Sequence, residues 1–253
     1  MKNLWTFGCS YTGEYYPIDD PDHVTAYDKY KKWRGGNLPD VWPTILANKL
    51  GMQIQNKGLG GDSNYAIFNQ FINICEQVKE GDILIFGWTN IIRFQAANNY
   101  RDIFNQILPC DSDFKLVTGL STKTIEEIFV NRTNPMWVRE IYSWIKFINL
   151  FCDKIGANVF HWTSDERLFT KNSDVVIDNR FIVARDEDYV EKHGHSLFGF
   201  LHWPTNYEGK EISRISEETN GEVNDGHLGE FGHKFQAEFF YDYIIKNKDV
   251  RFI

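Results

Sequence analysis

Short apolar runs alternate along this chain with longer segments in which apolar residues recur at helical spacing. The short runs are typical of buried strands, and the longer segments of helices with one apolar face. The predicted strands occupy residues 4–7, 52–56, 82–88 and 157–162. The predicted helices occupy residues 40–50, 64–81, 134–156 and 228–248. This alternation predicts a three-layer α/β/α sandwich around a doubly wound parallel sheet of about five strands.

Two long stretches interrupt the alternation. Residues 94–133 are polar and irregular, and residues 163–221 mix charged and aromatic side chains. Long irregular stretches in a compact domain are usually lids, binding loops or appended elements. We find no internal repeat and no linker, so the pattern predicts a single domain over residues 1–253 with two insertions. Within the regular part, Asn64 is positioned to cap the helix that begins there.

Charge and composition narrow the function classes. The formal net charge of −8 argues against a nucleic-acid partner, because such proteins need a basic surface. No apolar run is long enough to cross a membrane, and the first residues lack the apolar core of a signal peptide. These features predict a cytoplasmic protein without a membrane partner. The four cysteines match no metal or redox spacing, and we predict no metal site.

Polar residues gather directly after the predicted strands. Small and polar residues follow the first three strands at 8–10, 58–64 and 87–90, and a further group, 224–227, precedes the last helix. In an open parallel α/β sheet, ligands bind outside the carboxyl ends of the strands. We therefore expect these four groups to meet at one edge of the sheet.

The residue types in these groups suit acyl transfer. Ser10 could act as a nucleophile if His227 removes its proton, and Asp225 is the nearest carboxylate able to orient that imidazole. A tetrahedral intermediate also needs donors aimed at its oxyanion. The backbone N–H groups of Ser10 and Gly61 and the side-chain amide of Asn90 could supply them.

Four blocks in this order resemble the SGNH (GDSL-type) hydrolases. They are "FGCSYT", "NKGLGGDSN", "FGWTN" and "DGHLGEFGH". The resemblance implies a flavodoxin-like layout, with Ser10 as nucleophile, Gly61 and Asn90 in the oxyanion hole, and Asp225 and His227 completing the triad. It implies no metal and no organic cofactor.

Two departures from the family pattern leave alternatives open. Thr89 occupies the strict Gly-x-Asn position of the third block, so either Thr89 or Asn90 could be the donor. In the last of the four blocks, "DGHLGEFGH", the family's common spacing is Asp-x-x-His, which would select Asn224. We prefer Asp225 because it carries the negative charge that stabilises an imidazolium.

Side chains next to the site are candidates for substrate contacts. We assign this role to Tyr11, Trp88 and Arg93, since the Arg93 guanidinium could clamp a carboxylate. Cys9 replaces the family's usual aspartate before the serine. Because side-chain direction alternates along an extended segment, we expect Cys9 to point inward when Ser10 points toward the edge.

These interpretations converge on a serine esterase. The resemblance admits acetyl esters on carbohydrates, lipid esters and thioesters, and the aromatic and polar insertions favour a small acetyl ester on a carbohydrate. The alternative is a non-catalytic module of the same fold that binds a glycan or a partner protein. In either case the expected partner is a small molecule, a carbohydrate or a protein, and no cofactor is predicted.

Overall fold

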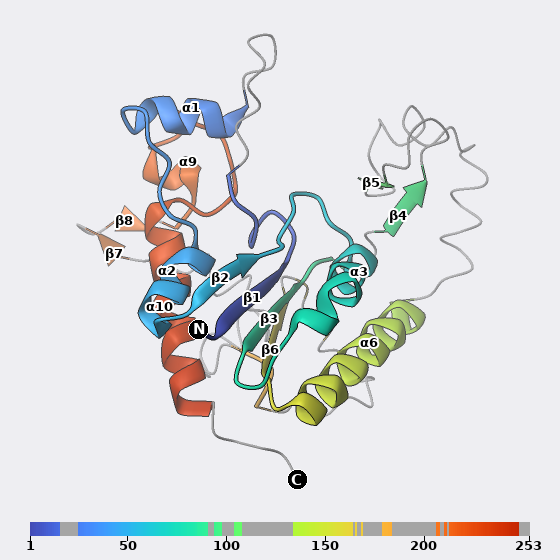
Figure 1. Cartoon of the computed structure of the whole chain (residues 1–253). Coiled ribbons are helices and arrows are strands. Elements are labelled where there is room, and N and C mark those ends of the chain that lie inside the picture. Colours follow the sequence, from blue (N-terminus) through green and yellow to red (C-terminus); the bar gives the residue numbers. More distant parts are fainter. Residues whose placement is uncertain are drawn as a thin grey trace, which may run out of the picture.

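A parallel sheet forms the centre of the computed structural model (Figure 1). The structure describes residues 1–15, 25–90, 94–97, 104–107, 134–163, 165, 168, 179–183, 206–207, 210–211 and 213–247. Its central strands are β1 (Asn3–Gly8), β2 (Gln53–Asn56), β3 (Ile83–Trp88) and β6 (Asn158–Thr163). They lie in the order β2-β1-β3-β6, and every pair is parallel. A parallel bridge between His161 and Phe181 adds one further contact beyond β6.

Helices cover both faces of this sheet. One face is covered by α2 (Trp42–Leu50) and α10 (Glu230–Asn247), and the other by α3 (Asn64–Ile74) and α6 (Asn134–Ile155) (Figure 1). A short 3-10 turn, η1 (Cys75–Gln77), extends α3. The predicted three-layer, doubly wound α/β fold is therefore confirmed, and each predicted strand and helix lies close to its expected bounds. Within the described residues the sheet has four strands and not the five or so that were predicted.

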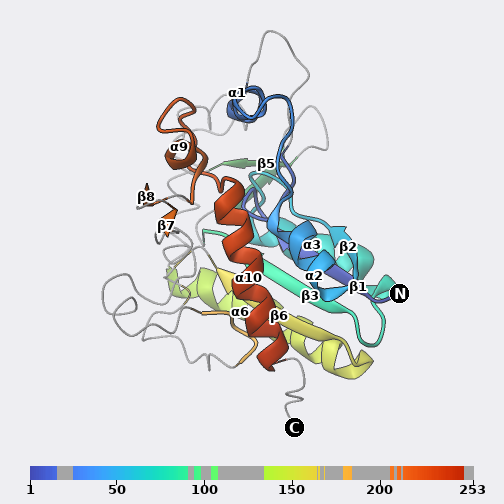
Figure 2. The same ribbon diagram turned by 90° about the vertical axis from the view of Figure 1, so that its left-hand side faces the viewer.

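The smaller elements lie outside this sandwich. They are α1 (Ala26–Trp33), α9 (Ile215–Glu218), the strand pair β4 (Phe94–Ala97) and β5 (Phe104–Ile107), and the strand pair β7 (Asn206–Tyr207) and β8 (Lys210–Glu211). Figure 2 shows α1 and α9 near the N-terminal end of α10. The pairs β4–β5 and β7–β8 and the helix α9 belong to the two predicted insertions, most of whose residues lie outside the described ranges.

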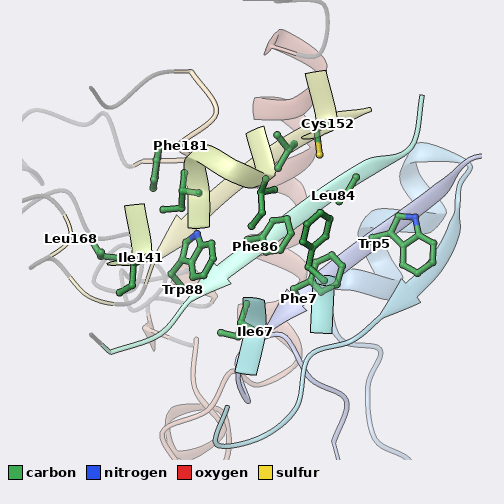
Figure 3. Close-up of a cluster of buried hydrophobic side chains, with 14 of the residues drawn as sticks. Trp5, Phe7, Ile67, Leu84, Phe86, Trp88, Ile141, Cys152, Leu168 and Phe181 are labelled. Atoms are coloured by element: carbon green, nitrogen blue, oxygen red, sulfur yellow. The ribbon is translucent and has the colours of Figure 1, made fainter. Parts of the chain in front are cut away.

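Separate apolar cores fill the two layers. On the α3 and α6 side, aromatic rings of β1 and β3 stack with each other, as Phe7 and Phe86 do at a centroid separation of 4.5 Å (Figure 3). On the α2 and α10 side, Trp42 packs edge-on against Phe240 at 4.8 Å. Because helices bury both faces of the sheet, only polar side chains at the ends of its strands can reach a ligand.

Local signals explain where the helices begin and end. Ser63, and not Asn64 as predicted, caps α3: its hydroxyl accepts the N–H of Ala66 at 3.2 Å. Helix α2 ends at Gly51, whose φ of 64° lies in the left-handed region that glycine adopts without strain. Within the described part of the chain, none of the helices combines the length and apolar content that crossing a bilayer requires.

Candidate active site

Ser10 lies in a tight turn directly after β1. The turn is closed by the N–H groups of Thr12 and Gly13, which both donate to the Cys9 carbonyl at 2.8 and 3.0 Å. Gly8 is required here, because a Cβ at this position would lie 2.2 Å from the Thr12 Oγ1. Cys9 is buried at 3% exposure while Ser10 is half-buried, so the side chain of Cys9 is directed inward as expected, although in a turn and not in an extended segment.

A continuous chain of contacts links Ser10 to a histidine and an aspartate. Ser10 Oγ lies 2.8 Å from His227 Nε2, and His227 Nδ1 lies 2.7 Å from Asp225 Oδ1. A carboxylate only accepts hydrogen bonds, so Nδ1 carries the ring hydrogen and Nε2 is left to accept from the Ser10 hydroxyl. Asn224, the alternative partner, is exposed, and Asp225 is the residue that contacts the imidazole.

The carboxylate of Asp225 is held in its ionised form. Burial by itself raises the pKa of Asp225, but the hydrogen bonds from the His227 ring and backbone outweigh it and leave the pKa below its usual value. The backbone N–H of His227 donates to the same Oδ1 atom at 2.7 Å. Asp225 therefore presents a fixed negative charge to the imidazole at neutral pH.

The loop that carries these two residues is anchored by the first turn of α9. The Ile215 N–H donates to the His227 carbonyl at 2.9 Å, and the Ser216 N–H donates to the Asp225 carbonyl at 3.1 Å. Helix α9 thus uses its free N-terminal donors to hold the loop. This support was missed in the sequence, where α9 falls in a stretch predicted to be irregular.

A buried carboxylate ties α9 to α1 and α10. Glu218 Oε1 accepts from the Tyr30 hydroxyl at 2.8 Å and from Arg34 at 3.1 Å, and its Oε2 accepts the Glu230 N–H at 2.8 Å. The side chain of Glu218 is only 5% exposed. These bonds satisfy the first turn of α10, which begins three residues after His227.

Two tyrosine rings flank the imidazole. The rings of Tyr11 and Tyr27 lie 5.2 and 5.7 Å from the His227 ring, measured between centroids. Burial, followed by the charge of Asp225, raises the pKa of Tyr27, so this phenol stays neutral. Tyr11 was predicted from its position after Ser10. Tyr27 was missed because it lies on α1, and site residues were sought only directly after predicted strands and before the last helix.

The glycine-rich loop after β2 packs against the Ser10 turn. A Cβ at Gly58 would lie 2.6 Å from the backbone nitrogen of Gly13, so only glycine allows this approach. A Cβ at Gly60 would lie 3.9 Å from the Ser10 Cβ, and Gly61 follows with a φ of 83°. The loop that holds the predicted donor Gly61 therefore borders Ser10, and Gly60 is the member placed against its side chain.

The segment after β3 brings the remaining predicted residues to this edge. Thr89 is buried at 3% exposure, whereas Asn90 is half-buried and more open to a ligand. The Asn64 side chain bonds to the backbone of both residues: Oδ1 accepts the Thr89 N–H at 2.8 Å, and Nδ2 donates to the Thr89 carbonyl at 3.0 Å and to the Asn90 carbonyl at 3.4 Å. Arg93 lies outside the described residues.

The prediction that Trp88 contacts substrate is wrong. Its side chain is fully buried beside Phe86 and Ile141 in the core on the α6 side (Figure 3). Its Nε1–H donates to His161 Nδ1 at 3.2 Å. Strand β3 is central and covered on both faces, so a side chain at its last position still points into a helix layer.

Among the described residues, histidine, cysteine and carboxylate side chains do not gather in any group of three or more that could hold a metal ion. His161 and Trp162, near the end of β6, are buried at 0% and 1% exposure. His233, on α10, is also buried, and its Nδ1 accepts the Trp42 N–H at the start of α2 at 3.1 Å.

Comparisons with known proteins find solved structures of low similarity to this chain. No family model matches the chain, and no curated protein matches it. The crystal structure of the YXIM protein of Bacillus subtilis is 12% identical with a TM-score of 0.42, over 99% of this chain and 58% of that one. This chain therefore spans less than two thirds of that protein. A Desulfitobacterium hafniense protein provisionally described as a lipolytic member of the G-D-S-L family is 12% identical with a TM-score of 0.24, over 79% of this chain and 97% of that one.

Proposed function

We propose that this chain hydrolyses an ester through a seryl-acyl intermediate. The observation that carries the proposal is the chain of contacts from Ser10 Oγ to His227 Nε2, 2.8 Å, and from His227 Nδ1 to Asp225 Oδ1, 2.7 Å. A hydroxyl, an imidazole and a carboxylate in this order are the working parts of a serine nucleophile with its base.

In the acylation step, Ser10 Oγ attacks the ester carbonyl carbon while its proton moves to His227 Nε2. The imidazolium that forms is stabilised by the ionised Asp225, which also keeps the ring in the tautomer that can accept this proton. Collapse of the tetrahedral intermediate breaks the bond to the alcohol oxygen. His227 returns its proton to that oxygen, and the alcohol leaves.

The oxyanion of the tetrahedral intermediate would be held by the N–H groups of Ser10 and Gly61 and by the Asn90 amide, with Thr89 as the alternative third donor. Loss of one such donor typically raises a barrier by about 2.7–4 kcal/mol. The packing of the glycine loop against the Ser10 turn supports this role for Gly61. The greater exposure of Asn90 favours it over Thr89.

Deacylation repeats the same steps with water as the nucleophile. The water oxygen attacks the acyl carbon while His227 Nε2 accepts a proton from the water. The second tetrahedral intermediate collapses, Ser10 takes the proton back from the imidazolium, and the free acid leaves. No residue outside the three is needed to carry a proton.

For the substrate we propose a small acyl group, acetyl in the first instance, on a carbohydrate alcohol. The Tyr11 and Tyr27 rings beside His227 offer flat apolar surfaces with polar edges, which suit a sugar ring.

The test is hydrolysis of p-nitrophenyl acetate by the wild-type chain and by Ser10→Ala. We expect turnover by the wild type and a loss of about 10³-fold or more in the variant, since the nucleophile is gone. A fluorophosphonate probe should label Ser10 and nothing else. Equal rates for the two proteins would overturn the esterase proposal and favour the non-catalytic binding module.

A second measurement addresses the acyl and alcohol groups. Release of acetate from an acetylated monosaccharide is compared with hydrolysis of p-nitrophenyl acetate and p-nitrophenyl octanoate by the same preparation. We expect a higher kcat/KM for p-nitrophenyl acetate than for p-nitrophenyl octanoate. We also expect the wild type to release acetate from the sugar and Ser10→Ala not to do so. Preference for octanoate would contradict the proposed substrate class and leave the serine mechanism in place.

A further inference from the structure

We infer that Asn64 is a positioning residue that holds the two backbone segments of the oxyanion hole against each other. The inference rests on the proposed esterase function and names a residue that does not itself touch the substrate. Asn64 is the first residue of α3 and is 3% exposed. Its contacts are with the segment that follows β3, at residues 89–90.

The bonding pattern of Asn64 resembles that of a strand partner. Its Oδ1 accepts the Thr89 N–H at 2.8 Å and its Nδ2 donates to the Thr89 carbonyl at 3.0 Å. Strand β3 ends at Trp88, so the Thr89 backbone lies beyond the strand ladder. The amide of Asn64 thus supplies one acceptor and one donor where a neighbouring strand would otherwise offer them.

Asn64 is free for this role because another residue caps its helix. An asparagine at a helix start commonly accepts a backbone N–H in the first turn. Here Ser63 accepts the Ala66 N–H at 3.2 Å. The Asn64 side chain is therefore directed away from its own helix and onto the neighbouring segment.

The position of this contact connects it to both proposed donors. Gly61 precedes Asn64 by three residues, and the intervening Asp62 and Ser63 are buried at 2% and 0% exposure. Asn90 directly follows Thr89, and its carbonyl also accepts from Asn64 Nδ2 at 3.4 Å. One buried side chain therefore sets the distance between the Gly61 amide and the Asn90 side chain.

Donors of an oxyanion hole act only when they are aimed at the developing charge, so their separation affects the transition state more than substrate binding. Without the Asn64 side chain, the segment that carries Asn90 loses all three of its hydrogen bonds to that residue and can shift relative to Gly61. Misplacement of about 1 Å can cost about 100-fold in rate. We expect Asn64→Ala to lower kcat for p-nitrophenyl acetate by about 10- to 100-fold, with KM within about twofold of wild type.

Asn149→Ala is the matched control. Asn149 lies on α6, and its Oδ1 contacts His161 Nε2 at 2.8 Å, so this variant also removes an asparagine bond between a helix and the sheet. Its partner His161 bonds to the Trp88 side chain and not to the backbone of residues 89–90 that Asn64 contacts. We expect Asn149→Ala to lower Tm by an amount similar to Asn64→Ala while kcat stays within about twofold of wild type.

Asn64→Asp provides a second variant of nearly identical size. It keeps an acceptor for the Thr89 N–H but can no longer donate to the Thr89 and Asn90 carbonyls while ionised. We expect it to fold and to show the same loss in kcat at unchanged KM. It keeps the inference testable if Asn64→Ala is insoluble.

The outcomes separate this inference from the proposed function. If Ser10→Ala is inactive and a folded Asn64 variant keeps the wild-type kcat, Asn64 has no positioning role and the inference fails alone. It also fails if Asn149→Ala loses as much kcat as Asn64→Ala, because the loss then follows general destabilisation. If wild type and Ser10→Ala have equal rates, the esterase proposal fails and the role of Asn64 fails with it.

Discussion

Two largely buried aspartates lie at opposite edges of the same sheet. Asp82, directly before β3, is 1% exposed and accepts from the Asn3 N–H, the Trp5 Nε1–H and the Lys79 N–H at 2.9, 2.9 and 3.1 Å. Asp225, at the other edge, has a side chain that is 14% exposed and accepts from the His227 ring and backbone. In both, burial raises the pKa but hydrogen bonds outweigh it, so both pKa values lie below the usual one.

The difference between the two edges lies in what the donors connect to. The donors on Asp82 are backbone amides, the side-chain amide of Asn3 and an indole, which hold their hydrogens at all ordinary pH values. One of the two donors on Asp225 is an imidazole, which can gain a proton and whose other nitrogen reaches the Ser10 hydroxyl. A lowered carboxylate pKa is therefore found both at a structural anchor, Asp82, and at a candidate active site, Asp225. The two sites differ in that only Asp225 contacts a group that can gain and pass on a proton.

The largest predicted effect is that of Asp225→Asn on activity. An amide at this position can hold the imidazole in the wrong tautomer, with its hydrogen on Nε2, and cannot stabilise the imidazolium. We expect kcat for p-nitrophenyl acetate to fall by about 10³- to 10⁴-fold. Circular dichroism and Tm should remain close to wild type. A variant that retains more than a tenth of wild-type kcat would show that Asp225 does not orient His227.

Asp82→Asn should show the opposite result. The NH₂ group of the new amide would face at least one of the N–H groups that now donate to the carboxylate, and that hydrogen bond would be lost. The remaining hydrogen bonds would weaken because their acceptor would no longer carry a charge. We expect unfolding to become easier by about 2–3 kcal/mol in urea denaturation, with kcat changed less than twofold. Loss of activity without loss of stability would contradict the assignment of Asp82 as a structural anchor.

The buried histidines extend the same comparison to pH. Burial lowers the pKa of His161 and of His233 to about 3, and for His233 the charge of His227 adds to this effect. In the unfolded chain both imidazoles have a pKa near 6.5. Between pH 3 and pH 6.5 the folded state therefore binds fewer protons than the unfolded state. The stabilisation is complete above pH 6.5 and is lost progressively as pH falls toward 3.

Denaturation in urea at pH 7.5, 6.0 and 5.0 measures this effect. Each of the two histidines should contribute up to about 1.4 kcal/mol of lost stability per pH unit below 6.5. His161→Gln should reduce the slope of unfolding free energy against pH by up to about 1.4 kcal/mol per pH unit, which corresponds to one proton, since the uncharged amide does not titrate. A slope that is unchanged in this variant would mean that His161 is accessible to protons in the folded protein.

The smallest predicted effect is that of Asn224→Ala. Asn224 is exposed and stands at the spacing that the family pattern favours, but it is Asp225 that contacts His227. We expect kcat within about twofold of wild type and stability within about 0.5 kcal/mol, as for most exposed substitutions. A loss as large as that of Asp225→Asn would reverse the assignment of the carboxylate.

The layered fold and the first candidate residues followed from local patterns. Strand β3 is a continuous apolar run, and Gly51 marks the end of α2, so both elements were predictable from nearby residues alone. Helix α1 was not predicted, because Tyr30 is its only buried residue and its capping box at Thr25 and Asp28 is followed by a charged surface. Its apolar side faces α9, whose presence no local pattern indicated.

Other assignments depended on contacts between distant segments. Trp88 stands next to predicted donors in the chain, yet the helix layer on its face buries it completely. Tyr27 reaches His227 from α1, and Asn64 reaches Thr89 from α3. None of these contacts has a signature in the spacing of neighbouring residues.

The sequence by itself determined the alternation of strands and helices, the parallel sheet and the set of polar residues that follow its strands. These properties follow from periodicity and turn chemistry, which act over a few residues. Only the tertiary structure decided that Asp225 rather than Asn224 contacts His227, that Ser63 rather than Asn64 caps α3, and that Trp88 is buried. Those choices depend on which groups are brought within hydrogen-bonding distance across the fold, and a chain's local pattern carries no record of such distances.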